Sequence, residues 1–95
     1  MEEEFYATIK LVSGEELVSK VCYLSEEDKI MLERPLVVEN SKQKKGQLEV
    51  TGFALKEWIS ATFDNMFVIN RNHVLTMVEI EGEIVDFYEK TLLRM

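Results

Sequence analysis

The stretch from residue 66 to residue 80 most constrains what this chain can fold into. An apolar run, residues 66–69, is followed by four polar residues, and a second β-branched run begins at Val74. Val, Ile, Phe and Thr favour strands, and Asn is common in tight turns. The stretch therefore predicts two short strands joined by a polar corner that exposes Arg71 and His73.

Two further strands are predicted near the N-terminus. Residues 5–12 alternate, with Ala7, Ile9 and Leu11 on one face, which is the period of a half-buried strand. Residues 16–24 carry apolar side chains on both faces. A strand with two apolar faces is expected to bend and to be covered on both sides, as in a small barrel.

The middle of the chain predicts two more strands, over residues 29–39 and 47–56, with a polar loop over residues 40–46 between them. Pro35 lies inside the first of these strands. Because proline cannot donate a ladder hydrogen bond, it marks either a strand edge or a bulge.

Helical structure is predicted at the end of the chain and left open in one other place. Residues 81–95 carry apolar side chains at helical spacing, with acidic residues at the start and basic residues at the end, which suits the helix dipole. Residues 57–65 predict either an irregular excursion or one helical turn, with Trp58 and Phe63 expected to be buried. The apolar stripe of the helix consists of Ile84, Phe87, Tyr88, Leu92 and Met95.

Length limits the architecture to one domain, since the chain has 95 residues. We predict a mainly β domain over residues 1–95. It consists of a small, strongly bent, five- to six-stranded antiparallel barrel over residues 5–80 and an α-helix over residues 81–95.

The net charge narrows where nucleic acid could bind. The formal net charge of −7 repels nucleic acid over most of the surface, so a site would need a local basic patch. The corner is one such patch, because the fork of Arg71 suits a phosphate or a base edge. A salt bridge within an acidic protein is the alternative role for Arg71. A weaker patch is the predicted loop with Lys42, Lys44 and Lys45, for which a solvated loop is the alternative.

The sequence carries no pattern of catalytic or metal-ligating residues. Cys22 is the single cysteine and is expected in the core, and with one His the chain cannot supply the usual four-ligand zinc site. The carboxylates are dispersed, and the glycines are isolated, so neither acid–base catalysis nor phosphate cradling is indicated. We therefore predict no enzyme activity, no cofactor and no metal.

The sequence also indicates no membrane partner. No apolar run approaches the ~20 residues of a membrane span. The acidic residues 2–4 are unlike the basic start of a signal peptide, so a cytoplasmic location is expected.

Two motifs resemble those of the Sm-like family, which includes the Sm and Lsm proteins and bacterial Hfq. Residues 9–18, IKLVSGEELV, resemble the family's opening V-x-L-x-x-G-x-x-h-x-G, although Lys20 stands at the second glycine. Residues 73–78, HVLTMV, are similar to the Hfq run H-A-I-S-T-V, and Arg71 lies near the position of the Sm Arg-Gly pair. Asn72 replaces that glycine. The stretch from residue 28 to residue 32 has the Asp of the family's Asp-x-aromatic-x-Asn motif but lacks its aromatic residue and its Asn.

The resemblance implies an Sm-like barrel that assembles with copies of itself into a closed ring. It also implies single-stranded RNA as a partner, bound at Arg71, Asn72 and His73. The alternative is a protein-interaction or assembly module that keeps the ring and has no RNA site. The pattern is also similar to small Sm-like proteins of tailed phages, which implies the cytoplasm of an infected host cell.

Overall fold

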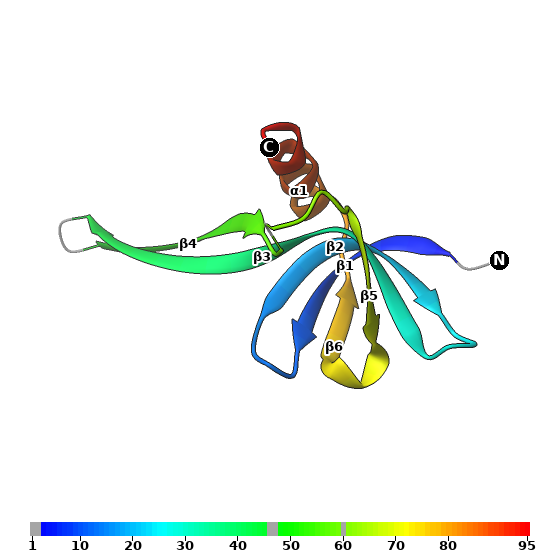
Figure 1. The fold of residues 1–95 in the computed structure, drawn as a ribbon. Helices are drawn as coiled ribbons and strands as arrows, with labels where there is room; N and C mark the ends of the chain where they lie inside the picture. The colour runs from blue at the N-terminus through cyan, green and yellow to red at the C-terminus, as the bar shows by residue number, and fades with distance from the viewer. Residues whose placement is uncertain (1–2, 46–47, 60) are drawn as a thin grey trace.

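The computed structural model describes residues 3–45, 48–59 and 61–95, and of residues 41–45 and 48–51 it describes the backbone only. It confirms the predicted antiparallel, mainly β fold with a C-terminal helix (Figure 1). The strands are β1 (Glu4–Leu11), β2 (Glu16–Leu24), β3 (Lys29–Lys45), β4 (Leu48–Glu57), β5 (Met66–Asn70) and β6 (Val74–Glu79). A 3-10 turn, η1 (Arg71–His73), joins β5 to β6, and the helix is α1 (Glu83–Leu93).

The strands form one bent sheet that does not close. Its order is β4-β3-β2-β1-β6, and β5 pairs with the first part of β3. No ladder joins β5 to β6 in the described part of the chain. The second half of β3 pairs with β4, and these two strands extend from the body as a long arm (Figure 1). The arm accounts for the elongated shape, with extents of 53 × 29 × 27 Å.

β3 changes partner at a bulge around Pro35. Val18 pairs with Leu36 and Lys20 pairs with Glu33, so one residue of β2 opposes two residues of β3, Arg34 and Pro35. Arg34 has a φ of 51°, and Pro35 is buried. An extra residue of this kind leaves ladder positions unpaired, which suits a residue without an N–H. The predicted edge or bulge at Pro35 is therefore a bulge.

The prediction of a loop over residues 40–46 is wrong for residues 40–45. These residues continue β3, because its ladder with β4 runs without a register shift to the pair Lys45 and Leu48. Residue 46 lies outside the described residues. The polar, lysine-rich composition predicts a loop, but the backbone of this segment pairs with β4 in a regular ladder.

Two apolar clusters lie on the two faces of the bent sheet. β2 contributes to both clusters, as its two apolar faces predicted, and Cys22 is buried as expected. The inner cluster consists of Ala7, Ile9, Leu11, Leu17, Val21, Ile30 and Leu32. The outer cluster consists of Val18, Leu36, Leu55 and Tyr88, and the last of these comes from α1.

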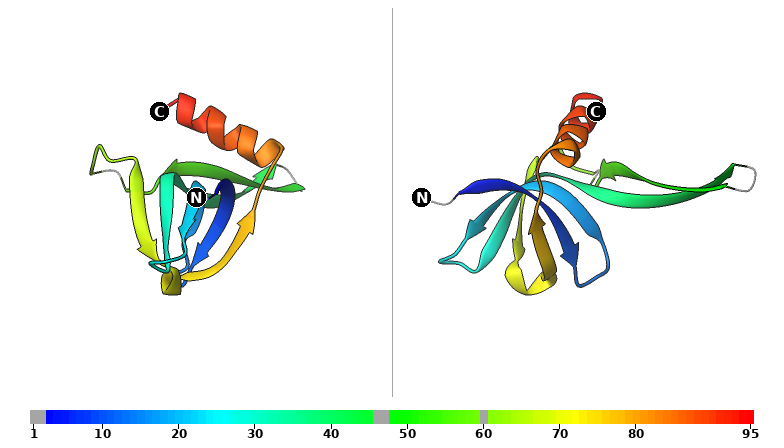
Figure 2. Two further views of the ribbon diagram at one scale, coloured as in Figure 1. Left: turned by 90° about the vertical axis from the view of Figure 1, so that its right-hand side faces the viewer. Right: turned by 180° about the vertical axis from the view of Figure 1, so that it is seen from behind.

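The predicted apolar stripe of α1 is buried only at its centre. Tyr88 is 2% exposed, and the partly buried side chains of Phe87 and Leu92 pack against the outer cluster. Ile84 is 40% exposed and Met95 is 63% exposed, so the two ends of the stripe are only partly covered. The helix crosses over the sheet at one end of the body (Figure 2).

The segment between β4 and β5 is irregular over its described residues, which settles the alternative left open for it. Trp58 is half-buried, and its Nε1 donates a hydrogen bond to Glu15 Oε2 at 2.7 Å. The prediction that Phe63 is buried is wrong, since its side chain is fully exposed (103%). Within the part of the chain that the structure describes, no element covers this side chain.

Candidate nucleic-acid corner and strand edges

The corner predicted from residues 70–73 is present as η1, and the side chains of Arg71, Asn72 and His73 are all exposed on it. Backbone hydrogen bonds fix it from two sides. The Val12 amide donates to the His73 carbonyl oxygen at 2.9 Å, and the Arg71 amide donates to the Asp28 carbonyl oxygen at 3.2 Å. The corner is therefore held by its backbone, which leaves its three polar side chains facing solvent.

The turn that holds the corner carries negative charge. It contains the exposed side chains of Glu26, Glu27 and Asp28. The Tyr23 hydroxyl donates to Asp28 Oδ1 at 2.9 Å, and no ion pair joins Arg71 to a carboxylate among the described residues. An approaching phosphate therefore meets Arg71 and the nearby Lys29, which pairs with Asn70, beside several carboxylates that weaken its attraction.

The second predicted basic patch lies far from the corner. Lys42, Lys44 and Lys45 belong to the part of β3 in the arm, whereas η1 lies at the opposite end of the body from α1 (Figure 1). The side chains of these lysines lie outside the described residues. The structure brings the three corner residues together and does not bring the lysines to them.

Two strand edges form a second candidate site. β5 has a ladder on one side only, with β3, and β6 has a ladder on one side only, with β1. The two strands lie on opposite sides of the body (Figure 2, left). Each carries exposed apolar side chains, which are between 50% and 68% exposed. These residues are Met66 and Val68 on β5 and Leu75 and Val78 on β6.

The sequence analysis did not single out these four side chains. The alternating pattern of β5 contained a signal, because apolar residues occupy both of its faces and only one face can be covered by the inner cluster. Phe67 and Ile69 take that covered face. A short strand with a second apolar face is typical of a contact with another element or another chain.

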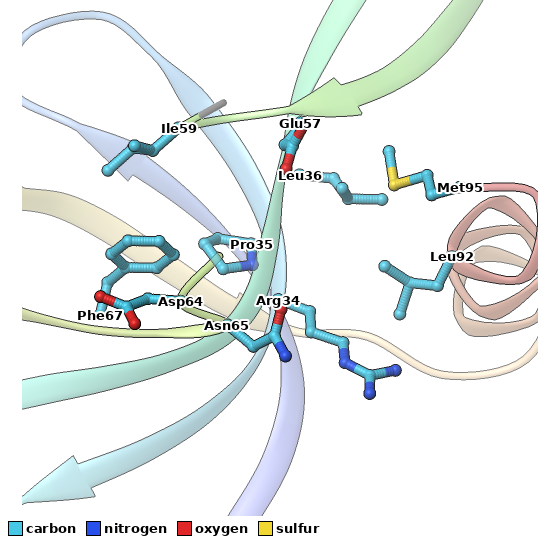
Figure 3. Close-up of a pocket in the computed structure, with 10 residues that line it drawn as sticks. All are labelled: Arg34, Pro35, Leu36, Glu57, Ile59, Asp64, Asn65, Phe67, Leu92 and Met95. Atoms are coloured by element: carbon cyan, nitrogen blue, oxygen red, sulfur yellow. The ribbon is translucent and has the colours of Figure 1, made fainter. Parts of the chain in front are cut away.

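A hollow of about 310 Å³ lies between α1 and the bulge (Figure 3). Leu92 and Met95 face Leu36 on one side of it, and Phe67 lies beside Pro35 on the other. The described residues contain no group of three or more His, Cys, Asp or Glu side chains that could hold a metal ion. The hollow is lined by both apolar and polar residues.

A second hollow, of about 390 Å³, lies beside the first and is bordered by Tyr6, Lys20 and Tyr88. The Tyr6 hydroxyl donates to Glu89 Oε1 at 3.0 Å, and this hydrogen bond raises the pKa of Tyr6. Lys20 Nζ lies 3.0 Å from Glu4 Oε2, and this hydrogen bond raises the pKa of Lys20. The polar groups at this wall are therefore paired with groups of the same chain.

Tyr88 connects α1 to the bulge. Its hydroxyl lies 2.7 Å from the Arg34 carbonyl oxygen and 3.0 Å from that of Glu33, and it donates to them. The hydroxyl of buried Ser19 also donates to the Glu33 carbonyl oxygen, at 3.0 Å. Burial raises the pKa of Tyr88 to about 12, because the charged phenolate would lose its contact with water.

The comparisons agree with this architecture. The family model of the Sm-like domain matches residues 8–89, which run from β1 into α1 and include all of η1. A search of curated proteins found no match. In the described residues, no helix is both long enough and apolar enough to cross a membrane.

Proposed function

The chain belongs to the Sm-like family, and on that premise we propose that it works as a homo-oligomeric ring in which β6 of one subunit pairs with β5 of the next. The observation that carries the proposal is the pair of unpaired strand edges on opposite sides of the body (Figure 2). An exposed strand edge pairs readily with another chain. Because the two edges differ, the contact is heterologous and closes into a ring when the rotation permits.

The direction of the strands supports this pairing. β5 and β6 run in opposite directions on the two sides of η1 (Figure 1). Copies related by rotation about an axis along these strands therefore bring their edges together antiparallel. The contact would also cover the exposed apolar side chains of both edges, and burying a Val, Leu or Met side chain contributes roughly 1.5–3 kcal/mol.

Light scattering tests the ring directly. We expect a single species that contains more than two subunits of 11.1 kDa each. Val68→Lys and Val78→Lys each place a charge on one edge and should shift the protein towards monomer. Val12→Lys is the matched control, because Val12 is an exposed valine on the turn after β1. A monomeric wild type at tens of micromolar would refute the ring.

RNA association at η1 is a second candidate function. The observation that favours it is the exposure of Arg71 and His73, which a ring would repeat by symmetry. Binding of short oligo-U and oligo-A at two salt concentrations tests it, because neutralised phosphates release counterions and affinity then falls with salt. Arg71→Ala should weaken binding and flatten the salt slope. Arg94→Ala makes the same charge change at the far end of α1 and should have little effect.

The alternative is an assembly module that has the ring but no RNA site. The carboxylates of the turn beside η1 and the net charge of −7 favour this alternative. If the ring binds neither oligo-U nor oligo-A at low salt, the assembly module is the function that remains. Binding that Arg71→Ala abolishes would exclude that alternative.

A further inference from the structure

We propose that the segment of residues 61–65 makes a second contact between subunits, in which Phe63 of one copy packs on Ile84 of the next copy. The occupant of this surface is therefore a second copy of the same chain. The inference rests on the proposed ring and adds an interface outside its paired strands.

The segment is built to present Phe63. The Thr62 Oγ1 accepts a hydrogen bond from the Asp64 amide at 3.0 Å, which closes a small turn around Phe63. The Asn65 carbonyl oxygen accepts a hydrogen bond from the Arg34 amide at 2.6 Å, which ties the segment to the bulge of β3. Phe63 itself is fully exposed between these two anchored points. A single exposed apolar residue is common, so the inference depends on where Phe63 lies.

The position of Phe63 matches the geometry of the proposed ring. Residues 61–65 directly precede β5, at the end of the body where α1 lies (Figure 1). β6 ends and α1 begins at that same end, but on the opposite side of the body (Figure 2, left). Antiparallel pairing sets the start of β5 beside the end of β6 from the next copy. Phe63 and the next copy's Ile84 therefore meet across the interface, although they lie apart within one subunit.

The junction between β6 and α1 offers an apolar surface for this contact. Val78 and Ile84 are exposed there, and Gly82 turns the chain into the helix with a φ of 69°. Glu79 and Glu81 are exposed beside them. An apolar centre with a charged rim is the usual anatomy of a protein interface, and an aromatic side chain is a frequent anchor.

The surface is also continuous with the proposed strand contact. Met66 and Val68 follow Phe63 along one edge, and Val78 precedes Ile84 along the other. These exposed apolar side chains follow one another along the two stretches of chain that the proposed ring would bring together. A second copy is the partner that brings both stretches together at once.

Chemical cross-linking tests the contact. In a Cys22→Ala background, a variant with Phe63→Cys and Ile84→Cys is treated with a bismaleimide and separated on a denaturing gel. The expected result is a ladder of covalent multimers that ends at the ring size, because each subunit is linked to two neighbours. Either single substitution should give no ladder. The pair Val12→Cys and Ile84→Cys is the control, since the turn between β1 and β2 and the helix α1 lie at opposite ends of the body (Figure 1) and should not be linked.

Dissociation gives an independent measurement. Phe63→Ser should raise the protein concentration at which the assembly dissociates by about tenfold or more, the effect expected on losing an aromatic anchor. Val12→Ser should leave it unchanged. If the wild type forms a ring, but the double-cysteine variant gives no ladder and Phe63→Ser does not change dissociation, this contact is overturned while the ring stays intact. A monomeric wild type would overturn both proposals.

Discussion

The inner and outer apolar clusters of the sheet are built in different ways. The inner cluster has seven buried residues, all of them from β1, β2 and β3. The outer cluster has four, and one of them, Tyr88, comes from α1. Strand alternation alone produces the first cluster, whereas the second exists only when the helix docks on the sheet.

The bulge explains where the helix docks. The carbonyl oxygens of Glu33 and Arg34 lie at the bulge and accept hydrogen bonds from Tyr88, and a buried carbonyl without a donor is costly. Tyr88 fills space in the outer cluster and supplies the hydroxyl that these oxygens need. The position of α1 is therefore determined by polar groups of the sheet as much as by apolar area.

A cavity in the inner cluster should cause the largest loss of stability. Leu32→Ala removes a side chain that is completely buried, so the free energy of unfolding should fall by about 2–5 kcal/mol. Urea denaturation at one fixed protein concentration measures it, since assembly makes stability depend on concentration. Leu93→Ala, at an exposed position of α1, should stay within about 0.5 kcal/mol of the wild type. Equal effects of the two variants would contradict the assignment of the inner core.

Loss of the Tyr88 hydroxyl tests the outer cluster. Tyr88→Phe keeps the aromatic ring of the side chain but leaves the Arg34 carbonyl without its side-chain donor and the Glu33 carbonyl with Ser19 alone, so the free energy of unfolding should fall by about 1–3 kcal/mol. Tyr6→Phe is the control, because the Tyr6 hydroxyl bonds an exposed carboxylate that water can solvate instead. If Tyr6→Phe proved the more damaging of the two, α1 would be held by its surface rather than by the bulge.

Alkaline pH weakens the contact of Tyr88 with the bulge without a substitution. Burial raises the pKa of Tyr88 from 10.0 to about 12 in the folded chain, so the folded state holds its proton where the unfolded state loses it. The stabilisation is complete below pH 10 and is lost as the pH rises towards 12. The melting temperature should therefore fall over this range, and fall less in Tyr88→Phe. Parallel curves for the two proteins would show that Tyr88 ionises freely.

The sequence predicted the parts of the fold that depend on local pattern. The alternation of β1, the two apolar faces of β2, the corner at η1 and the start of α1 all follow from the spacing of apolar residues. Pro35 marked the bulge because its missing N–H is a local property. The exposure of Arg71 and His73 could be predicted for the same reason, as polar residues in a short turn have little else to contact.

The parts that the sequence did not predict depend on what another element covers. An aromatic residue predicts a place in the core, but Phe63 lies in the irregular segment between β4 and β5, where none of the described residues covers it. The arm differs from the predicted loop because its ladder depends on the partner strand β4, which the polar composition of residues 40–45 does not reveal. The role of Tyr88 required knowing that the bulge lies under α1. The exposed side chains of β5 and β6 required knowing that the sheet stays open.

The smallest expected effect concerns the charged pair beside the outer cluster. Lys56 Nζ lies 3.0 Å from Glu39 Oε2 across β3 and β4, and both side chains are more than half exposed. Water and salt screen such a pair, so Lys56→Ala should lower the free energy of unfolding by less than about 1 kcal/mol. A double-mutant cycle with Glu39→Ala isolates the interaction, and added salt should reduce it. A coupling as large as the effect of Tyr88→Phe would mean that charges on the rim, rather than the hydroxyl under the helix, hold this face of the sheet together.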